Sequence, residues 1–242
     1  MSYLKDIGGW TREQLELRRT TRSLASSLVS NGPGAVIAEV KRASPSQGAI
    51  ASEIDPAAVA ARYAADGAAA ISVLTSERDF HGSYADLAAV RAVVDVPLLC
   101  KDFFVDIWQV TEARVHGADA ILVLLALVDD DLAADLIQAA EDHEMEVLVE
   151  VHDEDELRRA LALAAPIIGV NARDLATLEI HRGHQANLLR SIPPGFLRIA
   201  ESGIETPGHA EAAIQAGADA LLVGTALMRD PSLLGALRRA AG

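Results

Sequence analysis

This chain is poor in cysteine and in long apolar runs, which are typical of disulfide-linked, secreted or membrane-embedded proteins. Its 242 residues include one cysteine, Cys100, which excludes an internal disulfide and is typical of a reducing compartment. The first residues lack the apolar core of a signal peptide, and no apolar run reaches the roughly 18 uncharged residues that cross a bilayer. We therefore expect a cytoplasmic protein with no membrane contact.

Positive charge is also scarce. The chain has 21 Lys and Arg residues against 35 Asp and Glu residues, which gives a formal net charge of −14. An acidic protein gains nothing from counterion release on nucleic acid, and an anionic membrane repels it. Neither is therefore expected as a partner.

Lysine is the scarcest charged residue, since three of the 21 basic residues are lysines and the other 18 are arginines. Two of the three, Lys41 and Lys101, end the apolar runs 36–40 and 96–100. A lysine at the end of a buried strand is costly unless it is paired, and burial shifts its pKa readily. Each is a candidate catalytic acid or anion-binding group, although a structural ion pair or a side chain that reaches solvent would also explain it.

Eight short apolar runs, which do not alternate with polar residues, predict strands that are covered on both faces. The runs are 36–40, 69–74, 97–100, 120–125, 147–151, 167–170, 197–200 and 220–223. The segments between them have helical spacing, with a proline opening one at Pro56 and acidic residues opening those at 131–144 and 153–163. Gly-Ala-Asp-Ala occurs at both 117–120 and 217–220, which indicates either a duplication or a turn suited to joining helix and strand.

Strand–helix units that follow one another without a Pro- or Ser-rich linker predict an α/β fold, a single (β/α)8 or TIM barrel. We expect one domain over 1–242, with the barrel at 35–242 and a helical extension at 1–34 that holds an extra helix at 12–28. A doubly wound sheet is the alternative, but no Gly-x-Gly-x-x-Gly turn follows the first strand.

Charged residues sit at the carboxyl ends of these strands, where a barrel carries its chemistry. Glu39 and Lys41 are two residues apart and so share one face of the first strand, which should be the barrel interior. Lys101, Glu150 and Glu201 lie at the ends of three other strands. Such a group can tune its members into acids and bases, or it can be a structural layer of salt bridges.

A second group of strand-end residues predicts a phosphate site. Hydroxyl and backbone N–H groups are available after the first, seventh and eighth strands, at Ser44, Ser202, Gly203, Gly224 and Thr225. The loops after strands seven and eight form the common phosphate site of this fold. For each glycine alone, a simple turn of the chain is an equal explanation.

No metal site is expected. The seven histidines show no metal-binding spacing, and His181 and His184 lie three apart in a polar segment without a third ligand. Cys100 directly precedes Lys101, so its thiol should face the helices and be inert. The acidic runs 129–131 and 153–156 are expected to be solvated helix starts.

Seven segments, in order and at matching spacing over about residues 35–230, resemble the indole-3-glycerol-phosphate synthase family of tryptophan biosynthesis. The most specific is IAEVKRASPS at 37–46, followed by Gly48. The others are VLT at 73–75 with FHGS at 80–83, LCKDF at 99–103, LVEVH at 148–152, GVNARDL at 169–175, AESGI at 200–204 and LVGTALM at 222–228. Departures are small: Ala172 stands where the family often has asparagine, and His81 where glycine or asparagine is common.

The resemblance implies a carboxy-lyase that converts 1-(2-carboxyphenylamino)-1-deoxyribulose 5-phosphate into indole-3-glycerol phosphate, with release of carbon dioxide and water. It implies Lys101 as the general acid at the substrate ketone and Lys41 as the group that holds the anthranilate carboxylate. Glu150 would be a general base or stabilise an iminium-like intermediate, with Glu39 assisting. Which of these four residues serves the dehydration stays open.

The remaining site residues follow from the resemblance through their positions around the barrel mouth. They are Asn171 and Glu201 in the catalytic layer, Arg173 and Ser202 beside the substrate, Ser44, Gly203, Gly224 and Thr225 at the phosphate, and Phe80, Phe103 and Leu175 around the anthranilate ring. Neither a metal nor an organic cofactor is implied, because the aromatic amine of the substrate supplies the electrons for ring closure.

Other functions stay open on the sequence alone. A ribose-phosphate isomerase would share the phosphate end, and a Schiff-base aldolase would use a desolvated lysine as its nucleophile. A binding barrel without activity is the non-enzymatic alternative. In each case we expect an anionic small molecule as the partner. A monomer or weak homodimer is expected, and the helix surfaces show no clear apolar patch that would fix the oligomeric state.

Overall fold

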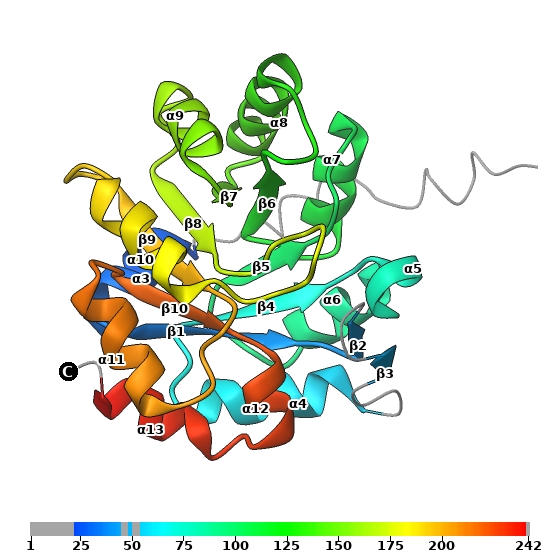
Figure 1. The fold of residues 1–242 in the computed structure, drawn as a ribbon. Coiled ribbons are helices and arrows are strands. Elements are labelled where there is room, and N and C mark those ends of the chain that lie inside the picture. Colours follow the sequence, from blue (N-terminus) through cyan, green and yellow to red (C-terminus); the bar gives the residue numbers. More distant parts are fainter. Residues whose placement is uncertain (1–21, 45–47, 50–53, 241–242) are drawn as a thin grey trace, which may run out of the picture.

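The described part of the chain, residues 22–44, 48–49 and 54–240 of a computed structural model, forms a closed barrel of eight parallel strands (Figure 1). The strands follow chain order around the barrel, and the last pairs with the first. They are β1 (Ala35–Val40), β4 (Ala70–Leu74), β5 (Leu98–Lys101), β6 (Ala120–Leu124), β7 (Glu146–Val151), β8 (Ile167–Asn171), β9 (Leu197–Glu201) and β10 (Ala220–Val223). The predicted (β/α)8 fold is confirmed, and each predicted strand end lies within one residue of the observed end.

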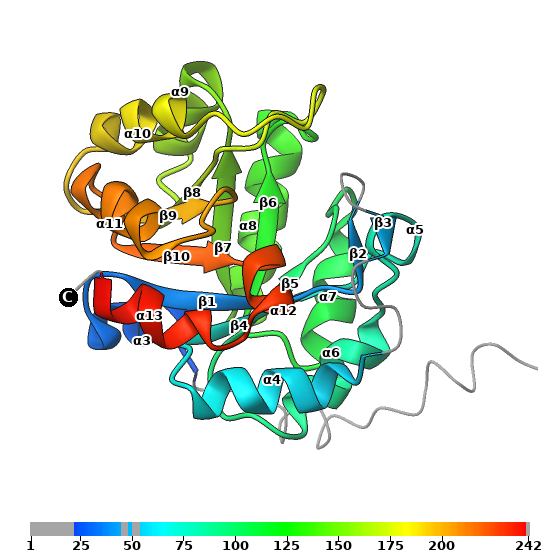
Figure 2. The same cartoon turned by 60° about the horizontal axis from the view of Figure 1, so that its bottom comes forward.

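Helices wrap the outside of the barrel, as Figures 1 and 2 show. They are α4 (Pro56–Ala65), α6 (Tyr84–Arg91), α7 (Ile107–Val115), α8 (Asp130–Asp142), α9 (Glu154–Ala162), α10 (Arg182–Ser191), α11 (Pro207–Gln215) and α13 (Leu233–Ala240). The side chains of Asp129 and Asp153 accept backbone N–H groups in the first turns of α8 and α9. The two acidic runs are therefore helix starts, as predicted.

Three short elements follow the carboxyl ends of strands and border the barrel mouth. After β1 comes a hairpin of β2 (Ala43–Ser44) and β3 (Gly48–Ala49), after β4 comes α5 (Glu77–Phe80), and after β10 comes α12 (Thr225–Arg229). Within the described ranges no helix is long and apolar enough to span a membrane.

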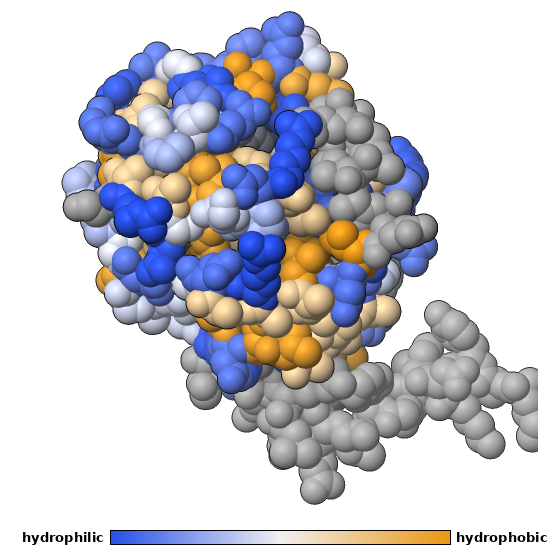
Figure 3. All heavy atoms as spheres, turned by 90° about the horizontal axis from the view of Figure 1, so that it is seen from below, coloured by the Kyte–Doolittle hydropathy of each residue, from blue (hydrophilic) through white to orange (hydrophobic). Residues whose placement is uncertain are grey.

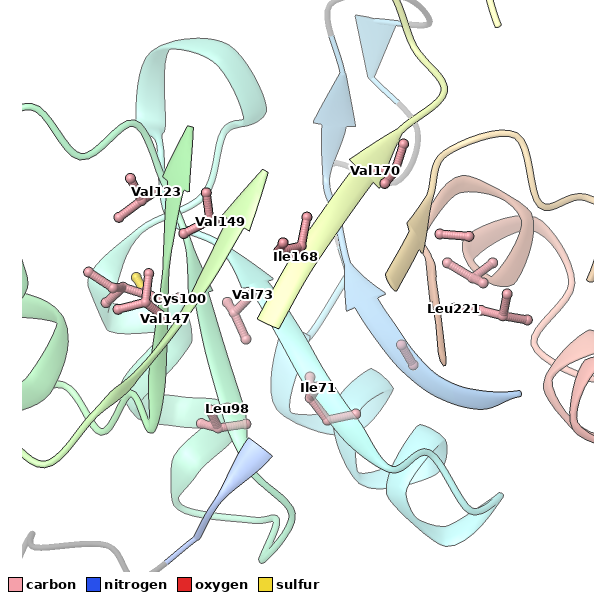
Figure 4. Packing of buried hydrophobic residues seen from close by; sticks show 14 of the residues in the cluster. Ile71, Val73, Leu98, Cys100, Val123, Val147, Val149, Ile168, Val170 and Leu221 are labelled. Atoms are coloured by element: carbon pink, nitrogen blue, oxygen red, sulfur yellow. The ribbon is translucent and has the colours of Figure 1, made fainter. Parts of the chain in front are cut away.

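The strand side chains alternate between two apolar layers. Outward-facing residues such as Val73, Cys100 and Val149 pack under the helices (Figure 4). Inward-facing residues such as Leu99 and Leu148 fill the lower barrel. Because Cys100 faces outward, its neighbour Lys101 on β5 faces the interior. Burial raises the pKa of the Cys100 thiol to about 12, which agrees with the predicted inert thiol.

Helix α3 (Leu24–Asn31) closes the amino-terminal end of the barrel. Leu24 and Leu28 are fully or almost fully buried and belong to the inner apolar cluster. The hydroxyl of Ser23 and the backbone N–H of Ala25 both donate to the carboxylate of Glu146 at the start of β7. This helix therefore fills the end of the barrel opposite the mouth.

The predicted extra helix at 12–28 is wrong in its extent. The chain at 22–23 is not helical, because Ser23 is the N-cap of α3 and its side chain accepts the N–H of Ser26. The helix runs on to Asn31 and ends where Gly32 adopts a left-handed φ of 77°. Residues 12–21 of the prediction lie outside the described residues.

The two Gly-Ala-Asp-Ala segments perform the same task at the amino-terminal ends of neighbouring strands. The carboxylate of Asp119 accepts the backbone N–H of Leu98 at 2.9 Å, and that of Asp219 accepts the backbone N–H of Arg198 at 2.9 Å. Each carboxylate also binds a guanidinium, from Arg91 and Arg198 respectively. Each Gly-Ala-Asp-Ala segment therefore ties the start of its own strand to the start of the preceding strand. Both links lie at the amino-terminal end of the barrel, where residues serve stability and not catalysis.

The surface is mixed in character. Over the face in Figure 3, hydrophobic side chains gather in several areas, one of them toward the lower edge, between hydrophilic ones. The exposed large apolar side chains include Val105, Ile107 and Trp108 around the start of α7, and apolar atoms normally contribute much of the surface of a folded protein.

Candidate active site

A pocket of about 430 Å³ opens at the carboxyl ends of the strands. It brings together thirteen of the fifteen predicted site residues: Glu39, Lys41, Phe80, Lys101, Phe103, Glu150, Asn171, Arg173, Leu175, Ser202, Gly203, Gly224 and Thr225. The fourteenth, Glu201, lies beneath the pocket. The side chain of the fifteenth, Ser44, lies outside what the structure describes.

Lys101 is the centre of the charged layer. Its Nζ lies 2.5 Å from Glu201 Oε2, 3.4 Å from Glu150 Oε2 and 4.0 Å from Glu39 Oε2. Burial on its own would lower the pKa of this amine, but the three carboxylates raise it above its usual range. Lys101 is therefore a protonated ammonium at neutral pH.

Lys41 forms the second positive centre, nearer the apolar wall. Its Nζ lies 2.5 Å from Glu39 Oε1, as expected for two side chains on one face of the chain. The same Nζ lies 6.0 Å from the centroid of the Phe80 ring, and that ring lies 6.1 Å from the ring of Phe103. One side of the pocket thus places an ammonium group at the edge of an aromatic surface.

Asn171 holds Glu150 in place. Its side-chain Nδ2 donates to Glu150 Oε1 at 2.7 Å, while its Oδ1 accepts the backbone N–H of Arg173 at 3.0 Å. Burial would raise the pKa of Glu150, but Lys101 first, and then His152 and Asn171, hold it well below its usual range. Glu150 is therefore a carboxylate that faces the pocket.

Glu201 differs from Glu150 in its surroundings. Its side chain is almost fully buried under the pocket, and its Oε1 has no hydrogen-bond partner within the described residues. Burial and the nearby charge of Glu150 raise its pKa, against the opposing effect of Lys101. The layer therefore holds two buried carboxyl groups whose pKa values are displaced in opposite directions, a common feature of acid–base sites.

Two glycines provide the room that the glutamates occupy. A Cβ on Gly169 of β8 would lie 2.0 Å from Glu201 Oε1, and one on Gly224 would lie 2.1 Å from Glu39 Oε1. Any larger residue would displace a carboxylate from the layer. Gly224, predicted at the phosphate, thus also contacts the charged layer.

The predicted phosphate end lies after β9 and β10. Ser202 and Gly203 both adopt left-handed backbone conformations, with φ of 63° and 71°. Such a conformation is unusual for serine and is found mainly where a site imposes it. Arg182 of α10 donates to the carbonyl of Gly203, which keeps this loop at the pocket rim.

His81 explains one departure from the family pattern. It ends α5 in a left-handed conformation with φ of 56°, the type of position that glycine or asparagine fills most easily. The following residue, Gly82, packs directly on the end of β4, where a Cβ would lie 1.9 Å from the carbonyl oxygen of Leu74. The turn therefore keeps its shape although histidine replaces the usual residue.

Sequence reasoning missed two parts of the site. The apolar floor and wall include Leu122, Leu124, Leu127, Leu178, Ile180 and Leu222. The spacing of Leu122 and Leu124 on one strand could have indicated inward side chains. It also missed that His152 contacts Glu150, with His152 Nε2 3.3 Å from Glu150 Oε1, although His152 follows Glu150 by two residues, directly after the end of β7.

Among the residues that the structure describes, no cluster of His, Cys, Asp or Glu could hold a metal ion. His184 Nε2 lies 2.9 Å from the carbonyl oxygen of His152, and His181 precedes the first turn of α10. Both histidines are exposed, in agreement with the prediction of surface residues.

Comparison with known proteins gives a consistent result. Residues 6–239 match the family model of indole-3-glycerol phosphate synthase. An indole-3-glycerol phosphate synthase of Nocardioides sp. is 47% identical over 257 residues, covering 100% of this chain and 99% of the relative. Indole-3-glycerol phosphate synthase 1 of Streptomyces coelicolor is 52% identical over 198 residues, covering 81% of this chain and 74% of the relative.

A solved structure, thiamine phosphate pyrophosphorylase from Pyrococcus furiosus, aligns with a TM-score of 0.65 at 16% identity over 90% of this chain and 98% of that one. At this identity the likeness is one of fold alone. The match to the family model, together with sequence identities of 47% and 52% to two relatives, identifies the family as well as the fold. On these two findings, the chain belongs to the indole-3-glycerol phosphate synthase family.

Proposed function

We infer that this chain is a carboxy-lyase that closes the indole ring of 1-(2-carboxyphenylamino)-1-deoxyribulose 5-phosphate and releases carbon dioxide and water. One observation carries the assignment of its chemistry. The ammonium of Lys101 lies at the wall of the pocket within 4.0 Å of three glutamates, in a chain whose family performs this reaction.

The two ends of the pocket suit the two ends of this substrate. The anthranilate ring would lie against Phe80 and Phe103, with its carboxylate toward Lys41. The phosphate would lie at the opposite end, at Ser202–Gly203 and Gly224–Thr225, with Arg173 as a further cation in the lining. In a protein of net charge −14, these local cations are what an anionic substrate needs.

The first step forms a carbon–carbon bond. The ring carbon that bears the carboxylate attacks the ketone carbon, with electrons from the aromatic nitrogen, and leaves an iminium. Lys101 Nζ donates its proton to the ketone oxygen as that oxygen becomes a hydroxyl. The raised pKa of Lys101 does not prevent this transfer, because a developing alkoxide is a stronger base than an amine.

The next two steps restore the aromatic system. The bond to the carboxylate breaks, carbon dioxide leaves, and its electron pair neutralises the iminium that the Glu150 carboxylate stabilises. Water is then lost: the hydroxyl leaves with a proton from an acid, and a base removes a proton from the neighbouring carbon. Lys101, Lys41, Glu39 and Glu150 supply both acids and bases within one layer.

A Schiff-base aldolase requires a neutral lysine as its nucleophile. The carboxylates around Lys101 favour the opposite state, because they hold its pKa above the usual range. Borohydride treatment with a ketose phosphate should therefore leave no adduct on Lys101 or Lys41. A covalent adduct on either residue would overturn the role of general acid.

We further propose that the chain works as one domain in the cytoplasm, as a monomer or weak homodimer, without nucleic acid and without a metal or organic cofactor. The negative net charge supports the absence of nucleic acid. The substrate amine, which supplies the electrons, makes a cofactor unnecessary. Light scattering during size-exclusion chromatography tests the oligomeric state. The absence of a metal requirement is tested by measuring activity after treatment with a chelator, which should leave it unchanged.

The function is tested by incubating the protein with the carboxyphenylamino substrate and following the fluorescence of the indole product. We expect product formation that depends on enzyme concentration. A rate no higher than that of a blank without enzyme would contradict the proposal.

A further inference from the structure

Behind Glu150, a series of charged side chains leads out of the pocket to helix α9. Glu150 Oε1 lies 3.3 Å from His152 Nε2, and His152 Nδ1 lies 3.1 Å from Glu156 Oε2. The same oxygen of Glu156 accepts the backbone N–H of His152 at 2.7 Å. The arrangement is a carboxylate, an imidazole and a second carboxylate in sequence.

Chain spacing and the start of α9 bring these three groups together. Glu150 and His152 are two residues apart, so both side chains leave the same face of the chain. Glu156 lies in the first turn of α9, whose N-cap Asp153 accepts the N–H of Glu156. On the other side, His184 of α10 lies 2.9 Å from the carbonyl oxygen of His152.

The imidazole of His152 is mostly shielded from solvent, with 13% of its side chain exposed, and carboxylates face both of its nitrogens. Burial alone lowers the pKa of His152, but Glu150 and Glu156 raise it to about 10. The imidazole is therefore a cation over the physiological pH range.

The other charged and polar groups around Glu150 come from four strands. Lys101 lies 3.4 Å away on β5, and Asn171 on β8 donates a hydrogen bond to it. Glu201 on β9 and Glu39 on β1 share Lys101 with Glu150. Glu39 also pairs with Lys41, so Glu150 and Glu201 are the two closest groups to Lys101. Of the three glutamates, Glu150 is the one that His152 contacts among the described residues.

We propose that His152, oriented by Glu156, is a positioning residue for Glu150 that keeps this carboxylate ionised and aimed into the pocket. The inference rests on the proposed function, in which Glu150 stabilises the cationic intermediate and serves as a base. The second cation lets Glu150 stay anionic while Lys101 remains in close contact with Glu201. The pKa values of the two glutamates are thereby displaced in opposite directions, although both side chains flank the same lysine.

The kinetic test uses His152→Gln and Glu156→Gln. Without the imidazolium, the pKa of Glu150 rises toward its usual range, so the acidic limb of the kcat profile should move up by about one pH unit. The loss of turnover should reach about tenfold at the acidic end and shrink toward pH 8, with KM within about threefold of wild type. His152→Arg, which keeps a cation, should restore the acidic limb in part.

Two matched controls separate this effect from general damage. Glu112 of α7 and His116, which caps the end of that helix, form a similar histidine–glutamate pair four residues apart, with 3.6 Å between His116 Nδ1 and Glu112 Oε1. His116→Gln, and Glu154→Gln at an exposed position of α9, should both leave the acidic limb unchanged. A limb that does not move in His152→Gln and Glu156→Gln, or that moves equally in the controls, would overturn the proposal.

A second measurement does not depend on activity. Proton titration of the histidine side chains by NMR should show one imidazole, absent in His152→Gln, with a pKa well above those of the others. That pKa should fall in Glu156→Gln. An ordinary pKa for His152 would overturn the positioning role even in an active enzyme. A raised pKa in a protein that forms no indole product would instead contradict the proposed function alone.

Discussion

Gly169 and Glu201 lie on the neighbouring strands β8 and β9, two residues apart in register, and the glycine leaves the space that the carboxylate fills. A Cβ on Gly169 would lie 2.0 Å from Glu201 Oε1. Glu201 in turn holds Lys101 at 2.5 Å. The absence of a side chain at Gly169 therefore lets Glu201 take the position in which it contacts the ammonium group of Lys101.

Gly169→Ala should therefore reduce turnover by about tenfold or more, because Glu201 must rotate away from Lys101. The extra methyl group should also lower the free energy of unfolding by about 1–3 kcal/mol, as overpacking does. Steady-state kinetics and urea unfolding measure the two effects.

Gly183 provides the matched control, since a Cβ there would meet no atom within 4 Å on the exposed side of α10. Gly183→Ala should leave turnover unchanged and raise the free energy of unfolding by up to about 1 kcal/mol. Wild-type turnover in Gly169→Ala would show that Glu201 does not need its present position.

Replacing Asp119 should lower the stability of the protein and leave its catalytic rate unchanged. Its buried carboxylate accepts the backbone N–H of Leu98 and pairs with Arg91 at the end of the barrel away from the mouth. Asp119→Ala leaves both donors buried and should lower the free energy of unfolding by about 3 kcal/mol or more. The kcat of the folded variant should equal that of wild type. The control is Asp135→Ala at an exposed position of α8, which should leave both kcat and the free energy of unfolding unchanged. A loss of kcat without a loss of stability would contradict this division between the two ends of the barrel.

The raised pKa of His152 predicts a pH dependence of stability. Its folded value is about 10, against 6.5 for the unfolded chain, so its contribution is complete below pH 6.5 and is lost as pH rises toward 10. Wild type should exceed His152→Gln in free energy of unfolding by on the order of 2 kcal/mol at pH 6, with the gap closing by pH 10. Urea unfolding at a series of pH values measures the gap. A difference that stays constant from pH 6 to pH 10 would mean that packing, and not charge, stabilises this position.

Much of the fold could be predicted because each buried strand is a short apolar run between helical segments. The runs at 120–125 and 220–223 coincide with β6 and β10 to within one residue, since strands covered on both faces need little else. The extra helix was predicted less well. Its start depends on the capping hydroxyl of Ser23 and its end on Gly32, and apolar periodicity alone indicates neither.

The site could be predicted in outline because strand order brings the carboxyl ends of all strands to one mouth. What escaped prediction depends on contacts between elements. Glu201 could be assigned to the mouth, but its place beneath Lys101 depends on the missing Cβ of Gly169. The contact between His152 and Glu156 depends on how α9 begins, because its first turn returns over the end of β7.

The central claim is that the ammonium of Lys101 is the proton donor of ring closure, and the turnover of Lys101→Ala tests it most directly. With the carboxyphenylamino substrate at saturation, kcat should fall by about 10²-fold or more, the scale of losing a general acid. Circular dichroism should confirm that the variant is folded. A folded Lys101→Ala protein that forms indole product at close to the wild-type rate would contradict the account.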